Sequence, residues 1–310
     1  MLRKFSLALI VAAVVLTSAC FSNEKTASEQ QTLPTVKAET VEVPSEPEPV
    51  PSTPPADRSV FDGVEQKIAQ HLNDGTEYAV YLAYPQKSTE TFIYNSQQMR
   101  SASMIKVFIM ATIMEKVKLG EISLDEPLTI NYENQVGGAG ILAGYGTGTQ
   151  LPLRKVMELM ITHSDNTATN MLIDRVGMGT INEYIQRNGY TDTYLGRKMM
   201  MFMGGENYSS VRDLGNFFLR LYHYDCVGEE YDKIMLDFLA GQTDTDCFPA
   251  ALPGVQVAHK TGALSGLYDD GGIIYSPQGH AILVIMTENY TGGEYTTIQH
   301  MKAFTRSVVK

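Results

Sequence analysis

The fold is decided by three apolar runs near the end of the chain: VQVAH at residues 255–259, GGIIY at 271–275 and AILVIMT at 281–287. Each run has the length of a β-strand and contains the β-branched and aromatic residues that favour one. The runs follow one another as hairpin-type strands, which pair antiparallel. We therefore predict an antiparallel β-sheet in this part of the chain.

Strand patterns also occur at the start of the folded sequence. Residues 78–84 and 91–94 are rich in Tyr, Val, Ile and Phe and predict a hairpin. The segments between the two groups of strands have helical periodicity instead. These predicted helices cover residues 105–117, 153–161, 168–176, 181–187, 211–222 and 231–239.

Two further helices are expected to flank the sheet. Phe61, Val64, Ile68 and Leu72 recur at helical spacing, and a last helix is predicted over residues 295–309. Because strands lie at both ends and helices fill the middle, we predict an α+β fold: an antiparallel β-sheet flanked by N- and C-terminal helices, with an inserted all-helical lobe. A cleft between two lobes is a usual place for an active site.

The first twenty residues (1–20) are expected to be a lipoprotein signal peptide. Two basic residues precede an apolar run over residues 7–16, which is too short to span a bilayer. The run ends in LTSAC, which resembles a bacterial lipobox, although Thr17 stands where Leu is preferred. That resemblance implies lipidation of Cys20, and ordinary signal cleavage beside an incidental cysteine is the alternative. Under either reading the protein is exported, and lipidation would anchor it to the membrane of the cell envelope.

Residues 21–57 are expected to form a disordered tether. They are rich in Glu, Thr, Ser and Pro and lack apolar periodicity. Such a segment offers too little apolar surface to offset the entropy lost on ordering. The folded domain is therefore predicted to cover residues 58–310.

Charge and cysteine content narrow the range of partners. The formal net charge of −11 argues against nucleic acid, because phosphate binding requires a basic face. No cluster of Cys and His has metal-ligand spacing, so neither a metal nor another cofactor is predicted. Besides Cys20 the chain holds Cys226 and Cys247, which in an exported protein either form a disulfide or remain two buried thiols. The even number suggests the disulfide, and the sequence leaves both alternatives open.

Three short motifs follow one another along the folded sequence: Ser103-Met104-Ile105-Lys106, Ser164-Asp165-Asn166 and Lys260-Thr261-Gly262. The first motif alone is uninformative, because Ser-x-x-Lys arises by chance roughly once in a chain of this size. Each tripeptide is expected by chance in only about one such chain in ten or fewer. The ordered set behind an export signal therefore indicates a common function.

The residue types suit covalent catalysis. A serine hydroxyl is a weak nucleophile until a base removes its proton. Lys106 lies one helical turn after Ser103, so both side chains can share one face. Ser103 opens an apolar helix, whose positive dipole end favours developing negative charge. Lys106 must be neutral to act as a base, and we expect burial and the nearby Lys260 cation to lower its pKa.

The ordered motifs resemble those of class A β-lactamases and penicillin-binding serine hydrolases. Longer segments also look like this family, namely residues 138–142, 159–174 and 257–263. The resemblance covers essentially the whole folded part, from about Ser59 to the C-terminus. It implies a β-lactamase/transpeptidase-like fold, with β-lactams or peptidoglycan stem peptides as substrates.

The resemblance also implies a catalytic role for four side chains. Ser103 would be the nucleophile and Lys106 its base. Ser164 would relay a proton toward the leaving nitrogen. Lys260 would meet the substrate carboxylate and would lower the pKa of Lys106.

Substrate binding is implied for four further residues. Thr261 would contact the substrate carboxylate together with Lys260, and Asn166 would hold a substrate amide. The backbone amides of Ser103 and Ala263 would form the oxyanion hole. Gly262 would let the substrate approach the strand edge closely.

Neighbouring polar residues are expected to have structural roles. Asp165 and Asn170 carry short side chains that bond backbone groups or neighbouring side chains. His259 flanks a motif and is expected to be a packing residue rather than a catalytic base.

The sequence departs from the β-lactamase pattern in two places. The resemblance puts Met199 at the position of the glutamate that activates the deacylating water in class A enzymes. Glu206 is the only acid in the second half of that loop and is a candidate substitute. No arginine stands in residues 268–273, where many family members carry one. Three readings therefore stay open: a β-lactam hydrolase with slow turnover, a D,D-peptidase, and a weakly catalytic lipoprotein that binds cell wall or β-lactams.

Overall fold

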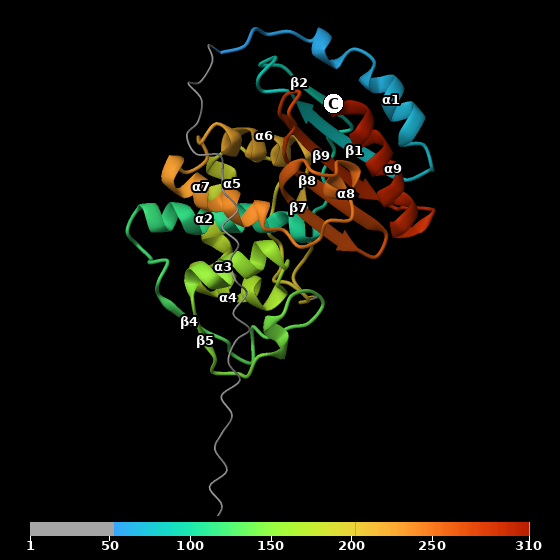
Figure 1. Cartoon of the computed structure of the whole chain (residues 1–310). Helices are drawn as coiled ribbons and strands as arrows, with labels where there is room; N and C mark the ends of the chain where they lie inside the picture. The colour runs from blue at the N-terminus through green and yellow to red at the C-terminus, as the bar shows by residue number, and fades with distance from the viewer. Residues whose placement is uncertain (1–52, 202, 310) are drawn as a thin grey trace, which may run out of the picture. The chain divides into compact units, whose positions relative to one another are not determined.

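The sheet-bearing lobe is built on five antiparallel strands in the computed structural model of the chain, which describes residues 53–201 and 203–309 (Figure 1). The strands lie in the order β2-β1-β9-β8-β7. Every neighbouring pair is antiparallel, which confirms the predicted sheet. The strands cover Glu77–Ala83 (β1), Thr91–Tyr94 (β2), Gln256–Leu264 (β7), Leu267–Tyr275 (β8) and Ala281–Glu288 (β9).

Both faces of this sheet are buried, and β1 shows how the sequence achieves it. Successive side chains of a strand point to opposite faces. Val80 and Leu82 join the core on one face, whereas Ala79, Tyr81 and Ala83 join the core on the other. A strand that is buried on both sides reads as a continuous apolar run, which explains why these strands lack alternating polarity.

The first and last helices cover one face of the sheet. Helix α1 (Val64–His71) packs against α9 (Gly293–Val308), and the short α8 (Phe248–Ala251) packs against α9 as well (Figure 1). Their apolar residues, among them Ile68, Phe248 and Phe304, form one core with the sheet residues of that face. The predicted flanking helices are therefore confirmed.

The opposite face of the sheet joins the helical lobe. Helix α6 (Val211–Tyr222) packs on β1, β8 and β9. A second core continues from this face into the helical lobe, as the α+β prediction requires. Within the described part of the chain, no helix has both the length and the apolarity needed to cross a membrane. The lobe contains α2 (Lys106–Lys118), α3 (Leu153–Thr162), α4 (Asn166–Val176), α5 (Met178–Arg187) and α7 (Glu229–Ala240).

Short elements were not predicted because two or three residues show no periodicity. Strand β3 (Met99–Arg100) pairs with β6 (Tyr208–Ser209), and β4 (Pro127–Thr129) pairs with β5 (Gln150–Pro152). Three 3-10 turns also occur: η1 (Ser59–Phe61), η2 (Ala102–Ile105) and η3 (Leu142–Gly144). Strand β3 and η2 matter for function, because β3 lies just before the candidate nucleophile Ser103 and η2 contains it.

The predicted disulfide is wrong. Cys226 and Cys247 are both buried free thiols. Cys226 belongs to the core on the helical side of the sheet, and Cys247 belongs to the core on the α1/α9 side. Because the sheet separates these two cores, the alternative of two buried thiols holds.

The predictions for residues 1–52 lie outside the described residues. They include the signal peptide, the lipidated Cys20 and most of the tether. They remain predictions.

Candidate active site

Ser103 lies on η2, directly before α2. Its neighbours Met104 and Ile105 are completely buried, whereas Ser103 itself is partly exposed. Ala102 adopts a left-handed backbone conformation with φ 41°, which is uncommon for a residue with a side chain. The apolar neighbours therefore anchor a strained turn that leaves the serine facing outward.

The Lys260-Thr261-Gly262 motif lies on β7, the edge strand of the sheet beside this turn. A Cβ added to Gly262 would lie 3.2 Å from Ala102 Cβ, from Met104 Cγ and from Ser101 O. The serine turn therefore occupies the space beside Gly262. We had predicted that the missing side chain would instead make room for a substrate. Ala263, the next residue along the edge, is exposed, as its expected role requires.

Ser164 stands between α3 and α4 in a left-handed conformation with φ 51°. Asp165 fixes this junction, because its Oδ1 accepts a hydrogen bond from the backbone of Ala168 at 2.8 Å and caps α4. Its Oδ2 accepts from the amides of Ile141 and Leu142 at 2.6 and 2.7 Å. Asp165 therefore ties a distant loop to the motif, which confirms its scaffold role.

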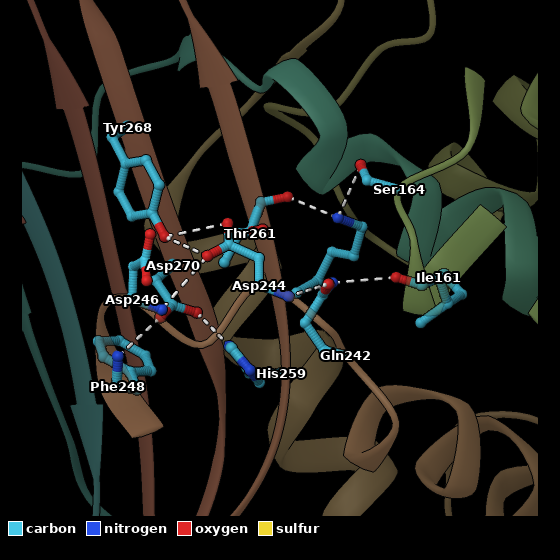
Figure 2. A network of polar contacts seen from close by, with 11 residues as sticks. Ile161, Ser164, Gln242, Asp244, Asp246, Phe248, His259, Thr261, Tyr268 and Asp270 are labelled. Carbon is cyan, nitrogen blue, oxygen red and sulfur yellow. Dashed lines mark hydrogen bonds and ion pairs between the residues drawn. The ribbon is translucent and has the colours of Figure 1, made fainter. Parts of the chain in front are cut away.

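The hydroxyl of Ser164 lies between two lysines (Figure 2). Lys106 Nζ lies 3.1 Å from Ser164 Oγ, 2.7 Å from Ser164 O and 2.9 Å from Asn166 Oδ1. Lys260 Nζ lies 3.0 Å from the same Oγ and donates to Thr261 O at 2.7 Å. The structure thus brings together the residues of all three motifs.

Both lysines are fully buried, and burial sets their charge. Desolvation lowers the pKa of Lys106 well below its usual value, the positive charge of Lys260 lowers it further, and Asp165 opposes both. Desolvation lowers the pKa of Lys260 to about 7, against the charges of Asp244 and Asp270. The shift of Lys106 has the direction that a general base requires.

Asn166 is committed to the protein on both sides of its amide. Its Oδ1 accepts from Lys106, and its Nδ2 donates to Gly137 O at 3.0 Å. One N–H of that amide remains for a substrate. Thr261 is also buried, and its carbonyl is the acceptor for Lys260.

Met199 is held at the place where a deacylating glutamate was expected. Asn170 binds its backbone twice, accepting from Met199 N at 2.8 Å and donating to Met199 O at 3.1 Å. The Met199 side chain is buried in the helical core. The scaffold role of Asn170 is thus confirmed, and a thioether in that position cannot take a proton from water.

Glu206 is engaged elsewhere. It forms an ion pair with Arg197 at 2.8 Å and accepts from the amide of Asn207 at 2.8 Å. A Cβ on Gly196 would lie 2.2 Å from Glu206 O, so the two ends of the loop meet there. These contacts place Glu206 at the closed base of the loop and give it a structural role.

Sequence reasoning missed an arginine near the site. Arg100 lies on β3, three residues before Ser103, and its Nε donates to Glu288 at 2.7 Å. Its Nη2 approaches Ser265 O at the end of β7 at 3.4 Å. Arg100 meets Glu288 and Ser265, both more than 160 residues later, only in the folded chain, so no local signal in the sequence could have found it.

A polar cluster behind β7 was also missed. His259 is buried and its Nδ1 lies 2.8 Å from Asp270 Oδ1, while Asp270 Oδ2 accepts from the amide of Phe248 at 3.1 Å (Figure 2). His259 is thus a buried packing residue with a fixed partner, as expected. Among residues 53–201 and 203–309, no three acidic, Cys or His side chains converge on a possible metal position.

Comparison with known proteins agrees with this geometry. A model of the beta-lactamase enzyme family matches residues 63–310. The extended-spectrum β-lactamase PER-1 from Pseudomonas aeruginosa is 24% identical over 200 residues, which are 59% of this chain. The chain spans 65% of the length of this curated relative.

Two solved structures carry the similarity over most of the folded part. A β-lactamase from Sphaerobacter thermophilus is 29% identical with a TM-score of 0.74, covering 80% of this chain and 95% of that one. A mutant of PBP-A, solved as an acyl-enzyme complex with penicillin-G, is 26% identical with a TM-score of 0.74. That match covers 82% of this chain and 97% of PBP-A.

Proposed function

Because this chain belongs to the beta-lactamase enzyme family, we propose that it is a serine acyl-enzyme acylated at Ser103 by β-lactams or by peptides ending in acyl-D-Ala-D-Ala. One observation carries the proposal: the Ser164 hydroxyl lies between Lys106 and Lys260, and β7 packs against the turn that carries Ser103. The penicillin-G acyl-enzyme of PBP-A supports the choice of a β-lactam as the first substrate to test.

Acylation follows from the positions of these groups. Ser103 Oγ attacks the carbonyl carbon while its proton passes to the lone pair of neutral Lys106. The oxyanion is stabilised by the backbone N–H groups of Ser103 and Ala263. The C–N bond then breaks, and the nitrogen receives the Ser164 proton, which a lysine replaces. A hydroxyl that accepts hydrogen bonds from lysines keeps its own proton available for this donation.

Deacylation of a β-lactam is proposed to be slow. The step needs a base that takes a proton from the attacking water, and such a base contributes about 10² to 10⁴ in rate. The resemblance puts Met199 at the position of that base, and Glu206 forms an ion pair with Arg197, which supports slow deacylation. A peptide substrate leaves behind a different acyl group and a different acceptor path, so D,D-peptidase activity is the alternative reading.

The nucleophile is tested with fluorescent penicillin. The wild-type protein is expected to be labelled stoichiometrically, and Ser103→Ala is expected to lose all labelling with little change in melting temperature. Undiminished labelling of that variant contradicts the assignment. Hydrolysis of a chromogenic cephalosporin, in parallel, separates rapid turnover, persistent labelling and the absence of both. These three outcomes indicate an ordinary β-lactamase, a penicillin-binding enzyme and a non-catalytic binding lipoprotein respectively.

We also propose that the protein is exported and lipid-anchored at the cell envelope through Cys20. The lipobox-like LTSAC and the Pro-rich segment after it support this proposal. The wild-type protein is expected to partition into detergent, and Cys20→Ala is expected to move to the aqueous phase. A wild-type protein found wholly in the soluble exported fraction would refute the anchor.

A further inference from the structure

The loop between α7 and α8 joins the two lobes beside the site (Figure 2). Gln242 Nε2 donates to Ile161 O at 2.9 Å. The backbone N–H of Thr243 donates to Thr162 O at 2.9 Å, and the Thr243 hydroxyl donates to the same oxygen at 2.8 Å. Ile161 and Thr162 end α3, directly before the Ser164 motif. The loop is therefore fastened to the helical lobe close to the proton relay.

The next residue, Asp244, is fastened to the sheet lobe. Its amide donates to Gln242 Oε1 at 3.0 Å. Its carboxylate accepts from the hydroxyl of Tyr268 on β8, with distances of 3.3 and 3.2 Å to the two oxygens. Burial raises the pKa of Tyr268, so this hydroxyl stays a neutral donor. Asp244 is thus held in place by both lobes, and its side chain is only partly exposed.

The loop that carries Asp244 is bonded to Thr162, two residues before Ser164, and Ser164 in turn contacts Lys260. Lys260 itself is bonded only to neutral groups in the described part of the chain. Its hydrogen bonds go to Ser164 Oγ and Thr261 O. Burial favours its neutral form, and Asp244 followed by Asp270 favours its charged form. The other titratable neighbour is Lys106 on α2, whose pKa Lys260 itself lowers.

The two carboxylates are not equivalent. Asp270 is already shared between His259 and the amide of Phe248 on the far face of β7. The carboxylate of Asp244 accepts hydrogen bonds from uncharged groups, namely the Tyr268 hydroxyl and the amide of Asp246 at 3.3 Å. In the described part of the chain no ion pair engages Asp244, so its negative charge remains available to favour the cationic form of Lys260.

We propose that Asp244 is a positioning residue that keeps Lys260 cationic during acylation, and that residues 242–246 are the strap that holds this charge in place from both lobes. The proposal rests on the proposed function for its consequence in catalysis, since a cationic Lys260 both lowers the pKa of Lys106 and supplies the proton that Ser164 passes on. Its electrostatic part stands without that function and can be measured separately.

The catalytic test is the pH profile of Ser103 acylation by benzylpenicillin. Asp244→Asn keeps the shape of the side chain and removes its charge. The midpoint of the basic limb, which reports the deprotonation of Lys260, is therefore expected to move to lower pH by about one unit. That displacement corresponds to acylation slower by about fivefold at pH 7 and about tenfold at pH 8. Asp246→Asn removes one charge from an exposed position in the same loop and is expected to leave the limb unmoved. Asp244→Glu is expected to restore most of the wild-type profile.

A second measurement separates this proposal from the proposed function. Carbon-13 NMR of labelled lysines, with Lys260→Arg to assign the signal, follows the titration of Lys260 without any substrate. Asp244→Asn is expected to lower the midpoint of that titration, and Asp246→Asn is expected not to. If both variants titrate like the wild type, the proposal is overturned. If the midpoint falls but no variant is ever acylated, the electrostatic inference stands and the proposed function fails.

Discussion

Ser164 receives contacts from both lysines of the site, so one hydroxyl connects the base beside the nucleophile with the cation on the edge strand. Two neighbouring polar residues hold the backbone of the site without taking part in the chemistry. Asp165 fixes the junction that carries Ser164, and Asn170 bonds the backbone of Met199. The resemblance to the family puts Met199 where a deacylating glutamate is expected, and we propose that this site forms an acyl-enzyme more readily than it removes one.

The Met199 position gives a direct test. Met199→Glu leaves the two backbone contacts to Asn170 in place and adds a carboxylate at the position expected for a general base. We expect penicillin deacylation to accelerate, by up to about 10² to 10⁴, while acylation changes little. Stopped-flow hydrolysis with intact-mass detection of the adduct measures both steps.

Two outcomes would contradict this prediction. One is rapid turnover by the wild type without an accumulating adduct, which would mean that another base operates. Glu206→Gln then tests whether that base is Glu206. The other is a Met199→Glu variant whose adduct persists as long as that of the wild type.

The serine turn and the edge strand act as a pair of elements. The turn η2 is strained at Ala102 and is held between the buried start of α2 and β7. Gly262 allows this contact, because a side chain there would lie too close to three atoms of the turn. The proposed oxyanion hole between the Ser103 and Ala263 amides would therefore depend on how closely one turn packs on one strand.

Gly262→Ala tests this coupling. The added Cβ would lie 3.2 Å from three atoms of the turn, so the turn must shift by a few tenths of an ångström. Overpacking of this kind costs about 1 to 3 kcal/mol of stability. We expect the acylation rate to fall by more than the loss of stability explains, as measured by penicillin labelling at a temperature where both proteins are folded.

The matched control is Gly179→Ala in α5. A Cβ at that position meets nothing within 4 Å, and Gly179 is not among the glycines with positive φ. Labelling should be unchanged in this variant. Equal labelling by Gly262→Ala would show that the turn does not need this close contact.

At the scale of the whole molecule, one sheet separates two cores, and neighbouring residues of β7 direct polar side chains to opposite faces of the sheet. Along β7 the ammonium of Lys260 reaches the helical lobe, whereas His259 contacts Asp270 on the α8 side. On β8, Asp269 is completely buried, with one oxygen accepting from the amide of Thr287 at 2.8 Å. Its other oxygen has no partner. Such a group lowers the stability of the fold when it is charged.

Asp269 therefore predicts a pH dependence of stability. Burial, the largest cause, raises the pKa of Asp269 well above its usual value. The native state then holds a proton that the unfolded state releases above about pH 4, so stability falls as pH rises from there toward the native pKa. Asp269→Asn imitates the protonated acid, and we expect its melting temperature to exceed that of the wild type by more at pH 7 than at pH 4. A difference that does not change between these pH values would show that Asp269 is not protonated in the fold.

Local patterns in the sequence determined the elements and the chemical groups. Apolar periodicity identified the long helices and the five strands, because burial on one face or both leaves its mark on consecutive residues. The three motifs identified Ser103, Lys106, Ser164 and Lys260, since each motif lies within a single turn or strand.

Only the tertiary structure decided which distant residues meet. The strand order brings Asp270 to His259, and the loop after α7 brings Asp244 to Tyr268. The tertiary structure also places Cys226 and Cys247 in separate cores, which the even number of cysteines could not reveal. The physical reason is that periodicity records whether a residue is buried, whereas a contact between segments depends on how the buried faces of several elements pack together.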